Sequence, residues 1–259
     1  MPLILTDCQA RIGTITLSYQ AKRNSLSHAL LQEMVAALHD LESQKVRAVV
    51  LRAKKGAPVW SAGLDITELP EPGRDPLSYN DPIEHVLRAI QHFPAPIIAL
   101  IEGSVWGGAC DLALTCDIAI GSPTASFCMT PAKVGIPYNS TGILHFINIV
   151  GERMAREMFF TAQPIDAERA WRIGILNHLV PGEQIESFTY DMARQVADNS
   201  PQSIAVIKEQ LGILSCSHPL SPDTFERIQG LRRRVYDSND YKEGKQAFLE
   251  KRKPVFKSE

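Results

Sequence analysis

The 259-residue sequence predicts an α/β core followed by a helical C-terminal region. Strand and helix patterns alternate over the first half of the chain, which is typical of parallel sheets with helices on their faces. Helical patterns then dominate from Gly142 through Leu249, and prolines divide them into segments. No long Gly/Ser linker separates the two regions, so the helices are expected to pack on the core or on a neighbouring subunit.

Hydrophobic periodicity predicts the elements of the core. Residues 14–17 alternate polar and apolar side chains as a half-buried strand does, whereas 48–51 and 97–101 are short apolar runs. Apolar residues repeat at helical spacing from Leu30 to Leu41, with Ser27 as the expected N-cap. The remaining expected elements are a helix over 83–92, a short apolar helix over 106–116, and strands over 117–120 and 125–128.

Composition narrows the class of protein. Lys plus Arg number 27 and Asp plus Glu 29, and this balance argues against a nucleic-acid surface. Glu102 and Asp111 interrupt the longest apolar stretch, so no membrane span is expected. The five cysteines are odd in number and form no CxxC, which favours a cytoplasmic protein with reduced thiols and no zinc site. The seven histidines are scattered, and all are expected to be structural or exposed.

Two glycine-containing junctions are candidates for chemistry. Ser61–Asp65 follows the strand at 48–51, and Glu102–Asp111 joins a strand to a helix. Glycine lets a backbone approach a ligand closely, and N–H groups at a helix N-terminus are unpaired and lie at its positive end. Two such groups could converge on one developing negative oxygen. Taken alone, each junction is better explained by a tight turn or close packing, and neither fits a phosphate-binding loop.

A set of blocks along the chain carries a resemblance to a known family: Asn24–Leu26, Ser61–Asp65, Glu102–Gly108, Cys116–Asp117 and Phe248–Arg252. On these blocks, the sequence resembles the crotonase (enoyl-CoA hydratase/isomerase) superfamily over essentially its whole length. Longer strings resemble its branch of bacterial methylmalonyl-CoA decarboxylases: Glu68–Pro70, Gly73–Tyr79, Gly103–Ala109, Met129–Pro131, Pro137–Asn139, Phe225–Gly230, Val235–Tyr241 and Ala247–Pro254.

The resemblance implies an architecture and a class of ligand. It implies a crotonase-like spiral ββα core over residues 1–195 and a helical trimerisation region over 196–259. Members of the superfamily are usually trimers or dimers of trimers, so a homo-oligomer is expected. The implied ligand is an acyl-CoA thioester, whose coenzyme A enters as part of the substrate. No metal, separate cofactor, nucleic acid or membrane is expected as a partner.

The resemblance also implies roles for particular residues. The backbone N–H groups of Leu64 and Gly108 form an oxyanion hole for the thioester carbonyl, and Tyr138 holds the leaving carboxylate. Asn139 is expected to assist Tyr138, and Thr130 to line the pocket. Lys22, Arg23 and Lys251 are expected to meet phosphate groups of coenzyme A, with Lys251 reaching a neighbouring subunit's site. Further residues expected to bind substrate are Leu26, Ala62, Gly63, Asp65, Ile66 and Asp111.

The carboxylate positions discriminate among the reactions of the superfamily. A hydratase of this family carries two glutamates, and this chain has Asp111 at the first position and Ala132 at the second. Alanine transfers no proton, so a two-carboxylate hydration mechanism is disfavoured. Decarboxylation needs an aligned carboxylate, a stabilised enolate and a proton donor. The expected reaction is therefore decarboxylation of a malonyl-type thioester, methylmalonyl-CoA to propionyl-CoA and CO₂.

Two positions depart from the family pattern and leave alternatives open. Leu64 stands where methylmalonyl-CoA decarboxylases of the best-known type carry histidine, so the N–H is kept and the imidazole is lost. Asp111 stands in place of glutamate. One alternative is an enoyl-CoA hydratase or isomerase. The other is a catalytically silent acyl-CoA-binding protein, which both departures would fit.

Overall fold

Two β-sheets form the centre of the protein in a computed structural model that describes residues 2–215 and 221–257; Cys216 lies outside the described residues. The larger sheet has the order β1-β2-β3-β5-β7-β10, from strands Ile4–Gln9, Ile12–Leu17, Ala48–Ala53, Ile97–Ile101, Ile118–Gly121 and His178–Leu179. The smaller sheet has the order β4-β6-β8-β9, from Val59–Ser61, Ser104–Trp106, Ser126–Cys128 and Ile165–Asp166. The β1–β2 and β8–β9 pairs are antiparallel and the others parallel.

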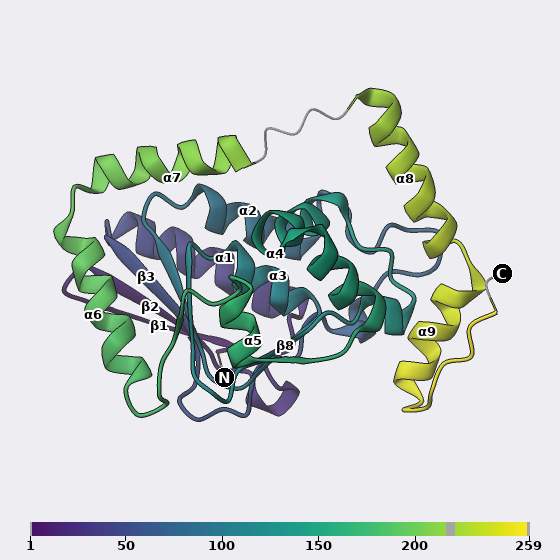
Figure 1. Ribbon diagram of the computed structural model, residues 1–259, viewed down its shortest axis with the longest axis horizontal. Helices are drawn as coiled ribbons and strands as arrows, with labels where there is room; N and C mark the ends of the chain where they lie inside the picture. Colours follow the sequence, from purple (N-terminus) through teal and green to yellow (C-terminus); the bar gives the residue numbers. More distant parts are fainter. Residues whose placement is uncertain (1, 216–220, 258–259) are drawn as a thin grey trace.

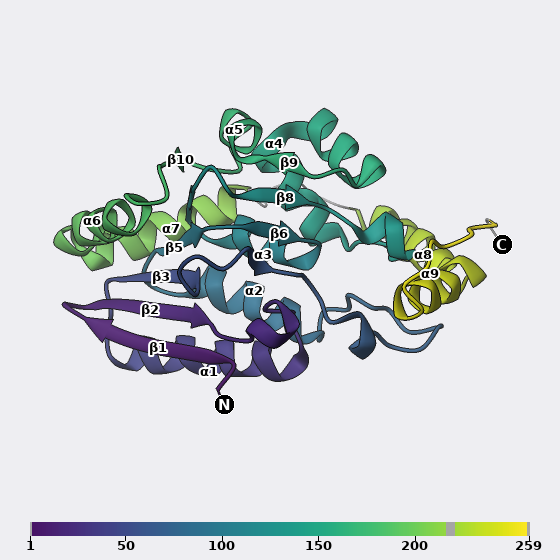
Figure 2. The ribbon, with the colours of Figure 1, turned by 90° about the horizontal axis from the view of Figure 1, so that it is seen from below.

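Successive strand pairs alternate between the two sheets. The pairs β3/β4, β5/β6 and β7/β8 each place their first strand in the larger sheet and their second in the smaller one (Figure 2). A helix follows the first two pairs: α2 (Pro82–His92) after β4, and α3 (Gly108–Thr115) after β6. This repeated ββα path confirms the spiral α/β core that the sequence predicts.

The middle strands of the larger sheet, β3 and β5, are buried on both faces, whereas the edge strand β1 is largely exposed. Along β3, Val49 and Leu51 belong to the main core, whereas Ala48 and Val50 face a second core under α6 (Ile185–Asp198). Alternate residues of a strand point to opposite faces, so a strand covered on both sides is apolar throughout. The main core lies between the sheets and α1 (His28–Ser43), α2 and α3.

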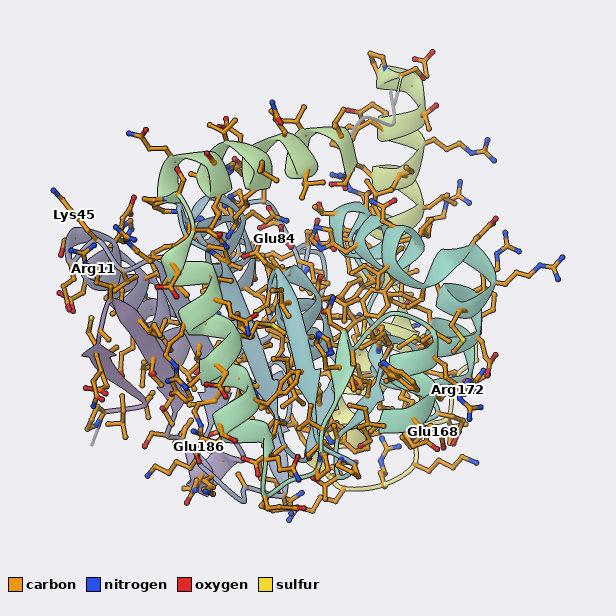
Figure 3. The ribbon with its side chains drawn as sticks, turned by 60° about the vertical axis from the view of Figure 1, so that its left-hand side comes forward. Arg11, Lys45, Glu84, Glu168, Arg172 and Glu186 are labelled. Atoms are coloured by element: carbon orange, nitrogen blue, oxygen red, sulfur yellow. The ribbon has the colours of Figure 1, made fainter. Side chains whose placement is uncertain are left out.

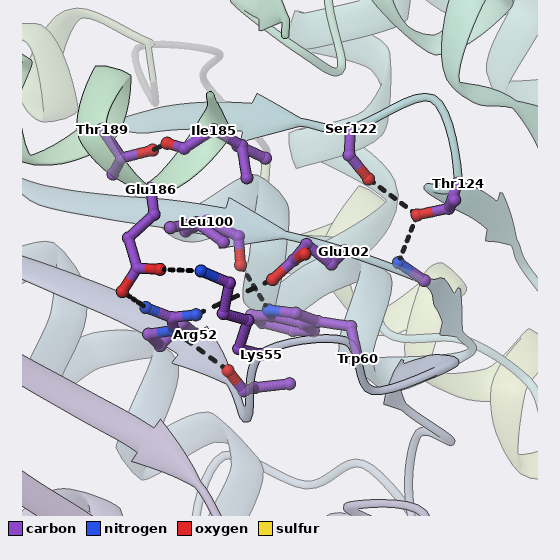
Figure 4. A network of polar contacts seen from close by, with 12 residues as sticks. Arg52, Lys55, Trp60, Leu100, Glu102, Ser122, Thr124, Ile185, Glu186 and Thr189 are labelled. Carbon is purple, nitrogen blue, oxygen red and sulfur yellow. Dashed lines mark hydrogen bonds and ion pairs between the residues drawn. The ribbon is translucent and has the colours of Figure 1, made fainter. Parts of the chain in front are cut away.

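A polar network attaches α6 to the larger sheet (Figure 4). Arg52 of β3 donates to Glu186 of α6 at 2.8 Å and lies 3.7 Å from Glu102. Lys55 reaches the other oxygen of Glu186 at 2.9 Å. Hydrogen bonds from Lys55 and Arg52 lower the pKa of Glu186 below its ordinary value. The Arg52 side chain is nearly buried, so these partners satisfy a charge inside the fold.

Helices dominate after Tyr138, as predicted, although β9 and β10 interrupt them. They are α4 (Ser140–Thr161, kinked at Gly151), α5 (Ala167–Arg172), α6, α7 (Pro201–Ser215), α8 (Pro222–Tyr236) and α9 (Asn239–Leu249). Helix α7 lies along the outside of the core, and α8 and α9 lie at one end of the molecule (Figure 1). The predicted division at 195/196 falls inside α6.

Most predicted elements are present, with one boundary in error. The Ser27 side chain caps α1 by accepting from the Leu30 N–H at 3.3 Å, as expected. The helix expected from Trp106 starts only at Gly108, because Trp106 belongs to β6 and Gly107 turns the chain at φ 51°. Several strands carried no periodic signal, since β4, β6, β9 and β10 have only two or three residues each.

Candidate active site

The two glycine-containing junctions meet in space. Leu26 pairs with the first junction, donating to the Gly63 oxygen at 2.8 Å and accepting from the Asp65 N–H at 3.3 Å. Gly63 has φ +82°, and a Cβ placed on it would collide with the Trp106 carbonyl and lie 3.4 Å from the Gly108 nitrogen. Only glycine fits this close approach, so the first junction lies directly against the start of α3.

Two backbone N–H groups are left without an acceptor at this contact. Gly108 is the first residue of α3, and its cap Gly107 has no side chain to accept from the helix. Leu64 lies in the loop beside it, with its Cγ 3.1 Å from where a Gly108 Cβ would stand. Within the described residues, neither N–H donates a hydrogen bond. Both are therefore available to a negative oxygen, and the helix end favours one.

Leu64 and Gly108, which carry these N–H groups, both line a cavity of about 760 Å³. Ten of the residues predicted to act at the site line it: Lys22, Arg23, Ala62, Gly63, Leu64, Asp65, Ile66, Gly108, Thr130 and Tyr138. Sequence reasoning missed other residues of the lining, among them Ser25, Trp106, Lys133, Ile136 and Phe248. They come from separate segments, so no local pattern in the sequence marks them.

Four predicted residues lie outside this lining. Leu26 lines a smaller adjoining cavity of about 370 Å³, which also touches Leu64. Asp111 and Asn139 are buried, and they are connected to the site through Tyr138 and its loop. Lys251 is exposed just after α9, whose Phe248 does line the cavity.

One ion pair lies at the wall of the cavity. Lys22 is 3.5 Å from Asp65, with the lysine half exposed and the carboxylate largely covered. Burial alone raises the pKa of Asp65, but hydrogen bonds from Thr67 and the charge of Lys22 bring it below its ordinary value. The carboxylate is therefore ionised at neutral pH and holds Lys22 beside the cavity.

Tyr138 begins a line of hydrogen bonds that leads away from the cavity. Its hydroxyl donates to Asp111 Oδ2 at 3.0 Å. The other carboxylate oxygen, Oδ1, is 2.9 Å from His145 Nδ1, and His145 Nε2 is 3.0 Å from the Gln91 amide nitrogen. Asp111 is only 2% exposed. The phenol that lines the cavity is thus tied to a buried carboxylate and, through it, to an imidazole.

A second buried carboxylate lies beside this line. Glu84 of α2 accepts from the Asn139 amide, and Arg88 is 3.8 Å from its other oxygen. Figure 3 shows Glu84 in the interior, in contrast to Glu168 and Arg172 at the surface. Burial, with the nearby Asp111 charge, raises the pKa of Glu84 above its ordinary value.

The same surroundings shift the pKa values of Tyr138 and His145. Burial and the Asp111 charge raise the pKa of Tyr138 well above 10, so the phenol keeps its proton. Burial alone would lower the pKa of His145, but the hydrogen bond and charge of Asp111 raise it above its ordinary value. His145 is largely buried and bonded to this site carboxylate, so the expectation that every histidine is merely structural or exposed misses its place in the site.

Residues 2–215 and 221–257 contain neither a cluster of metal-ligating side chains nor a membrane-spanning helix. No three or more His, Cys, Asp or Glu side chains there gather to hold a metal ion. No helix in that part of the chain has the length and apolar character to cross a membrane.

Comparisons with known proteins show the family of this chain. Residues 7–259 match the enoyl-CoA hydratase/isomerase family. The chain belongs to this family. One relative within the family is the methylmalonyl-CoA decarboxylase of Escherichia coli K12, 49% identical over 246 residues that cover 95% of this chain and 94% of that protein. A human relative, the mitochondrial enoyl-CoA hydratase domain-containing protein 3, is 32% identical over 96% of this chain and 81% of its own.

Solved structures of the enoyl-CoA hydratase/isomerase family also match. A methylmalonyl-CoA decarboxylase in complex with 2-nitronate-propionyl-CoA has a TM-score of 0.97 and 47% identity, covering 99% of both chains. Another, complexed with 2S-carboxypropyl-CoA, has a TM-score of 0.97 and 46% identity, covering 100% of this chain and 99% of that one. The crotonase fold expected from the sequence is confirmed.

Proposed function

We propose that this protein is a carboxy-lyase that decarboxylates methylmalonyl-CoA to propionyl-CoA and CO₂. The observation that carries the proposal is the 49% identity with a methylmalonyl-CoA decarboxylase over nearly the whole of both chains. The site geometry supports it, because two unpaired N–H groups and a phenol meet at one cavity.

The residues of the cavity fit the demands of this reaction. The N–H groups of Leu64 and Gly108 donate to the thioester oxygen and stabilise the enolate that forms when the C–CO₂ bond breaks. Tyr138 lines the same cavity and holds the leaving carboxylate. The electrons of the enolate come from the broken bond, so no base is needed to begin. The enolate carbon then takes up one proton from solvent, which completes propionyl-CoA. We further propose that the reaction uses no metal ion, biotin or nicotinamide, since the two N–H groups, the phenol, the broken C–C bond and this proton account for every step.

Hydration is the rival reaction within the family. It requires a second acid or base at the position of Ala132, which has no titratable group. The first carboxylate position also differs, because Asp111 is buried behind Tyr138 rather than lining the cavity. Both observations favour decarboxylation.

A single panel of thioesters tests the proposal. Malonyl-, methylmalonyl-, ethylmalonyl- and crotonyl-CoA are incubated separately with the protein, and the products are read by mass. Methylmalonyl-CoA should lose CO₂, whereas crotonyl-CoA should gain water very slowly. Rapid hydration with methylmalonyl-CoA untouched would make the protein a hydratase, and no conversion of any thioester would favour a silent acyl-CoA-binding protein.

We also propose that the protein acts as a homo-oligomer, a trimer or a dimer of trimers, in the cytoplasm. Helix α7 has no buried residue, and several of its apolar side chains are more than half exposed, among them Val206, Ile207, Leu211 and Ile213. Such a helix gains burial by meeting another subunit. The cytoplasmic location is supported by the cysteines within the described residues, which are free thiols.

A further inference from the structure

The Tyr138 hydroxyl has one hydrogen and two possible acceptors. In this structure the hydrogen is donated to Asp111 at 3.0 Å. A substrate carboxylate held by Tyr138 would need the same hydrogen. While Asp111 carries an uncompensated charge, it competes for that hydrogen and also repels the incoming carboxylate. Tyr138 can therefore donate to the substrate carboxylate only when Asp111 is a weaker hydrogen-bond acceptor.

His145 is placed to do this. Its Nδ1 lies 2.9 Å from Asp111 Oδ1, the carboxylate oxygen that Tyr138 does not contact. An imidazolium there would neutralise the carboxylate. The other ring nitrogen faces Gln91, whose amide can present either its NH₂ or its oxygen and so fits both charge states of the ring.

We propose that His145 is a positioning residue that acts through Asp111: as an imidazolium it releases the Tyr138 hydrogen from Asp111 to the carboxylate of the substrate. No covalent bond changes in this step, because the Tyr138 hydrogen stays on its oxygen and only its hydrogen-bond acceptor changes. The inference rests on the proposed function in one respect, that the ligand carries a carboxylate next to Tyr138.

The charges around His145 set the direction of the pH dependence. Asp111 of α3 and Glu84 of α2 face it as carboxylates, Arg88 of α2 pairs with Glu84, and Tyr138 stays protonated. The two carboxylates keep His145 protonated above its ordinary pKa of about 6.5. When pH rises through the raised pKa of His145, the imidazolium loses its positive charge. The affinity of the protein for a ligand carboxylate at Tyr138 should then fall.

Binding of two ligands that differ in one carboxylate tests the inference. The probes are 2-carboxypropyl-CoA, a thioether that cannot decarboxylate as a thioester does, and propyl-CoA, the thioether that lacks only the carboxylate. Affinities are measured by calorimetry from pH 6 to pH 9. The ratio of the two affinities should fall with pH, by at most about tenfold per pH unit for one linked proton. Propyl-CoA corrects for titration of the coenzyme A phosphates.

Two variants and a control isolate His145. His145→Gln keeps a donor to Asp111 without a charge, so the ratio should lose its pH dependence and stay about tenfold below the wild-type value at pH 6. His39→Gln, at an exposed position on α1, should keep the wild-type profile. In a Tyr138→Phe background, the penalty of His145→Gln should shrink, because His145 acts through the phenol.

The outcomes separate this inference from the proposed function. A pH-independent affinity ratio in the wild type, an unchanged profile in His145→Gln, or a full penalty of His145→Gln in the Tyr138→Phe background would overturn the role of His145. These are binding measurements, so absence of decarboxylation in the thioester panel would overturn the proposed function alone. Thermal unfolding of each variant confirms that it is folded.

Discussion

Leu64 contributes to the site through two different parts of the same residue. Its N–H points to no acceptor within the described residues, whereas its side chain contacts the start of α3 and lines both adjoining cavities. Backbone donors survive side-chain substitution, so the proposed oxyanion hole does not depend on which side chain stands at position 64. The side chain is instead placed to affect which acyl groups fit.

Truncation of Leu64 separates these two contributions. Leu64→Ala should change KM and the preference among malonyl-, methylmalonyl- and ethylmalonyl-CoA, while kcat for the best substrate changes little. Leu64→Pro deletes the donor, and losing such a donor costs about 2.7–4 kcal/mol of transition-state stabilisation. Steady-state kinetics on the three thioesters measure both effects, with circular dichroism to confirm folding. A collapse of kcat in Leu64→Ala would contradict this division of roles.

Tyr138 combines packing and hydrogen bonding, which a conservative substitution can separate. Its ring packs on Phe159 with centroids 5.2 Å apart, and its hydroxyl donates to Asp111. Tyr138→Phe keeps the ring and should lower kcat by about tenfold to a hundredfold, from a charged hydrogen bond worth about 1.5–3 kcal/mol. The free energy of unfolding, followed by thermal unfolding, should fall by much less than this loss of transition-state stabilisation. Unchanged kinetics would leave Tyr138 with packing alone.

At the scale of elements, the first turn of α4 is shaped around the site. A Cβ on Gly142 would collide with the Tyr138 ring and lie 2.6 Å from Asp111 Oδ2. The Gly142 N–H also donates to the Asn139 side chain, which caps α4. The first turn of α4 therefore contains a residue small enough to let the phenol and the carboxylate meet.

Gly142→Ala should damage the site even though alanine favours helices. Overpacking costs about 1–3 kcal/mol, which exceeds the gain of about 1 kcal/mol in helix propensity. We expect lower stability and a lower kcat, measured by urea unfolding and turnover. Gly230→Ala on α8 is the matched control, because no atom lies within 4 Å of its Cβ position. Equal behaviour of the two variants would mean that α4 can shift without cost.

The attachment of α6 to the sheet makes a separate prediction about stability. Arg52→Met leaves Glu186 and the largely covered Glu102 without their buried partner and should cost about 1–3 kcal/mol of unfolding free energy, with turnover unchanged. Lys55→Met, at an exposed lysine, should cost less than about 1 kcal/mol. Urea unfolding measures both, and equal costs would show that burial of Arg52 adds nothing.

The pH dependence of the Arg52→Met effect has a defined sign. The pKa of Glu186 is lowered in the folded protein, so its contribution is present above the unfolded pKa and is lost as pH falls through the folded value. The stability difference between wild type and Arg52→Met should therefore shrink in acid. A difference that grows as pH falls would contradict the ion pair as its source.

At the scale of the whole molecule, α7 is a helix most of whose apolar side chains stay exposed in the single chain. Light scattering after gel filtration should give a mass of three or six times 28.7 kDa. Leu211→Glu places a charge on the apolar side of α7 and should reduce the mass toward one chain. A monomeric wild type would contradict the proposed assembly.

Local patterns determined much of this protein by themselves. Periodicity placed α1, α2, β3 and β5, because apolar spacing follows the geometry of a helix or a strand. The two glycine-containing junctions could also be recognised from the sequence, because a close approach between two backbone segments requires glycine. Ala132, by contrast, excluded a proton-transfer group only because the family resemblance placed it at the second glutamate position of the hydratases.

Only the tertiary structure decided how the distant parts meet. The Tyr138 hydrogen bond to Asp111, the place of His145 behind it and the burial of Glu84 join segments 27 to 61 residues apart, and no spacing rule encodes such contacts. The shortest strands were also decided there, because two or three residues hold a strand through their neighbours in the sheet rather than through their own periodicity. Side chains acquire a charge state from the groups packed around them, so which acceptor Tyr138 serves is a property of the folded site.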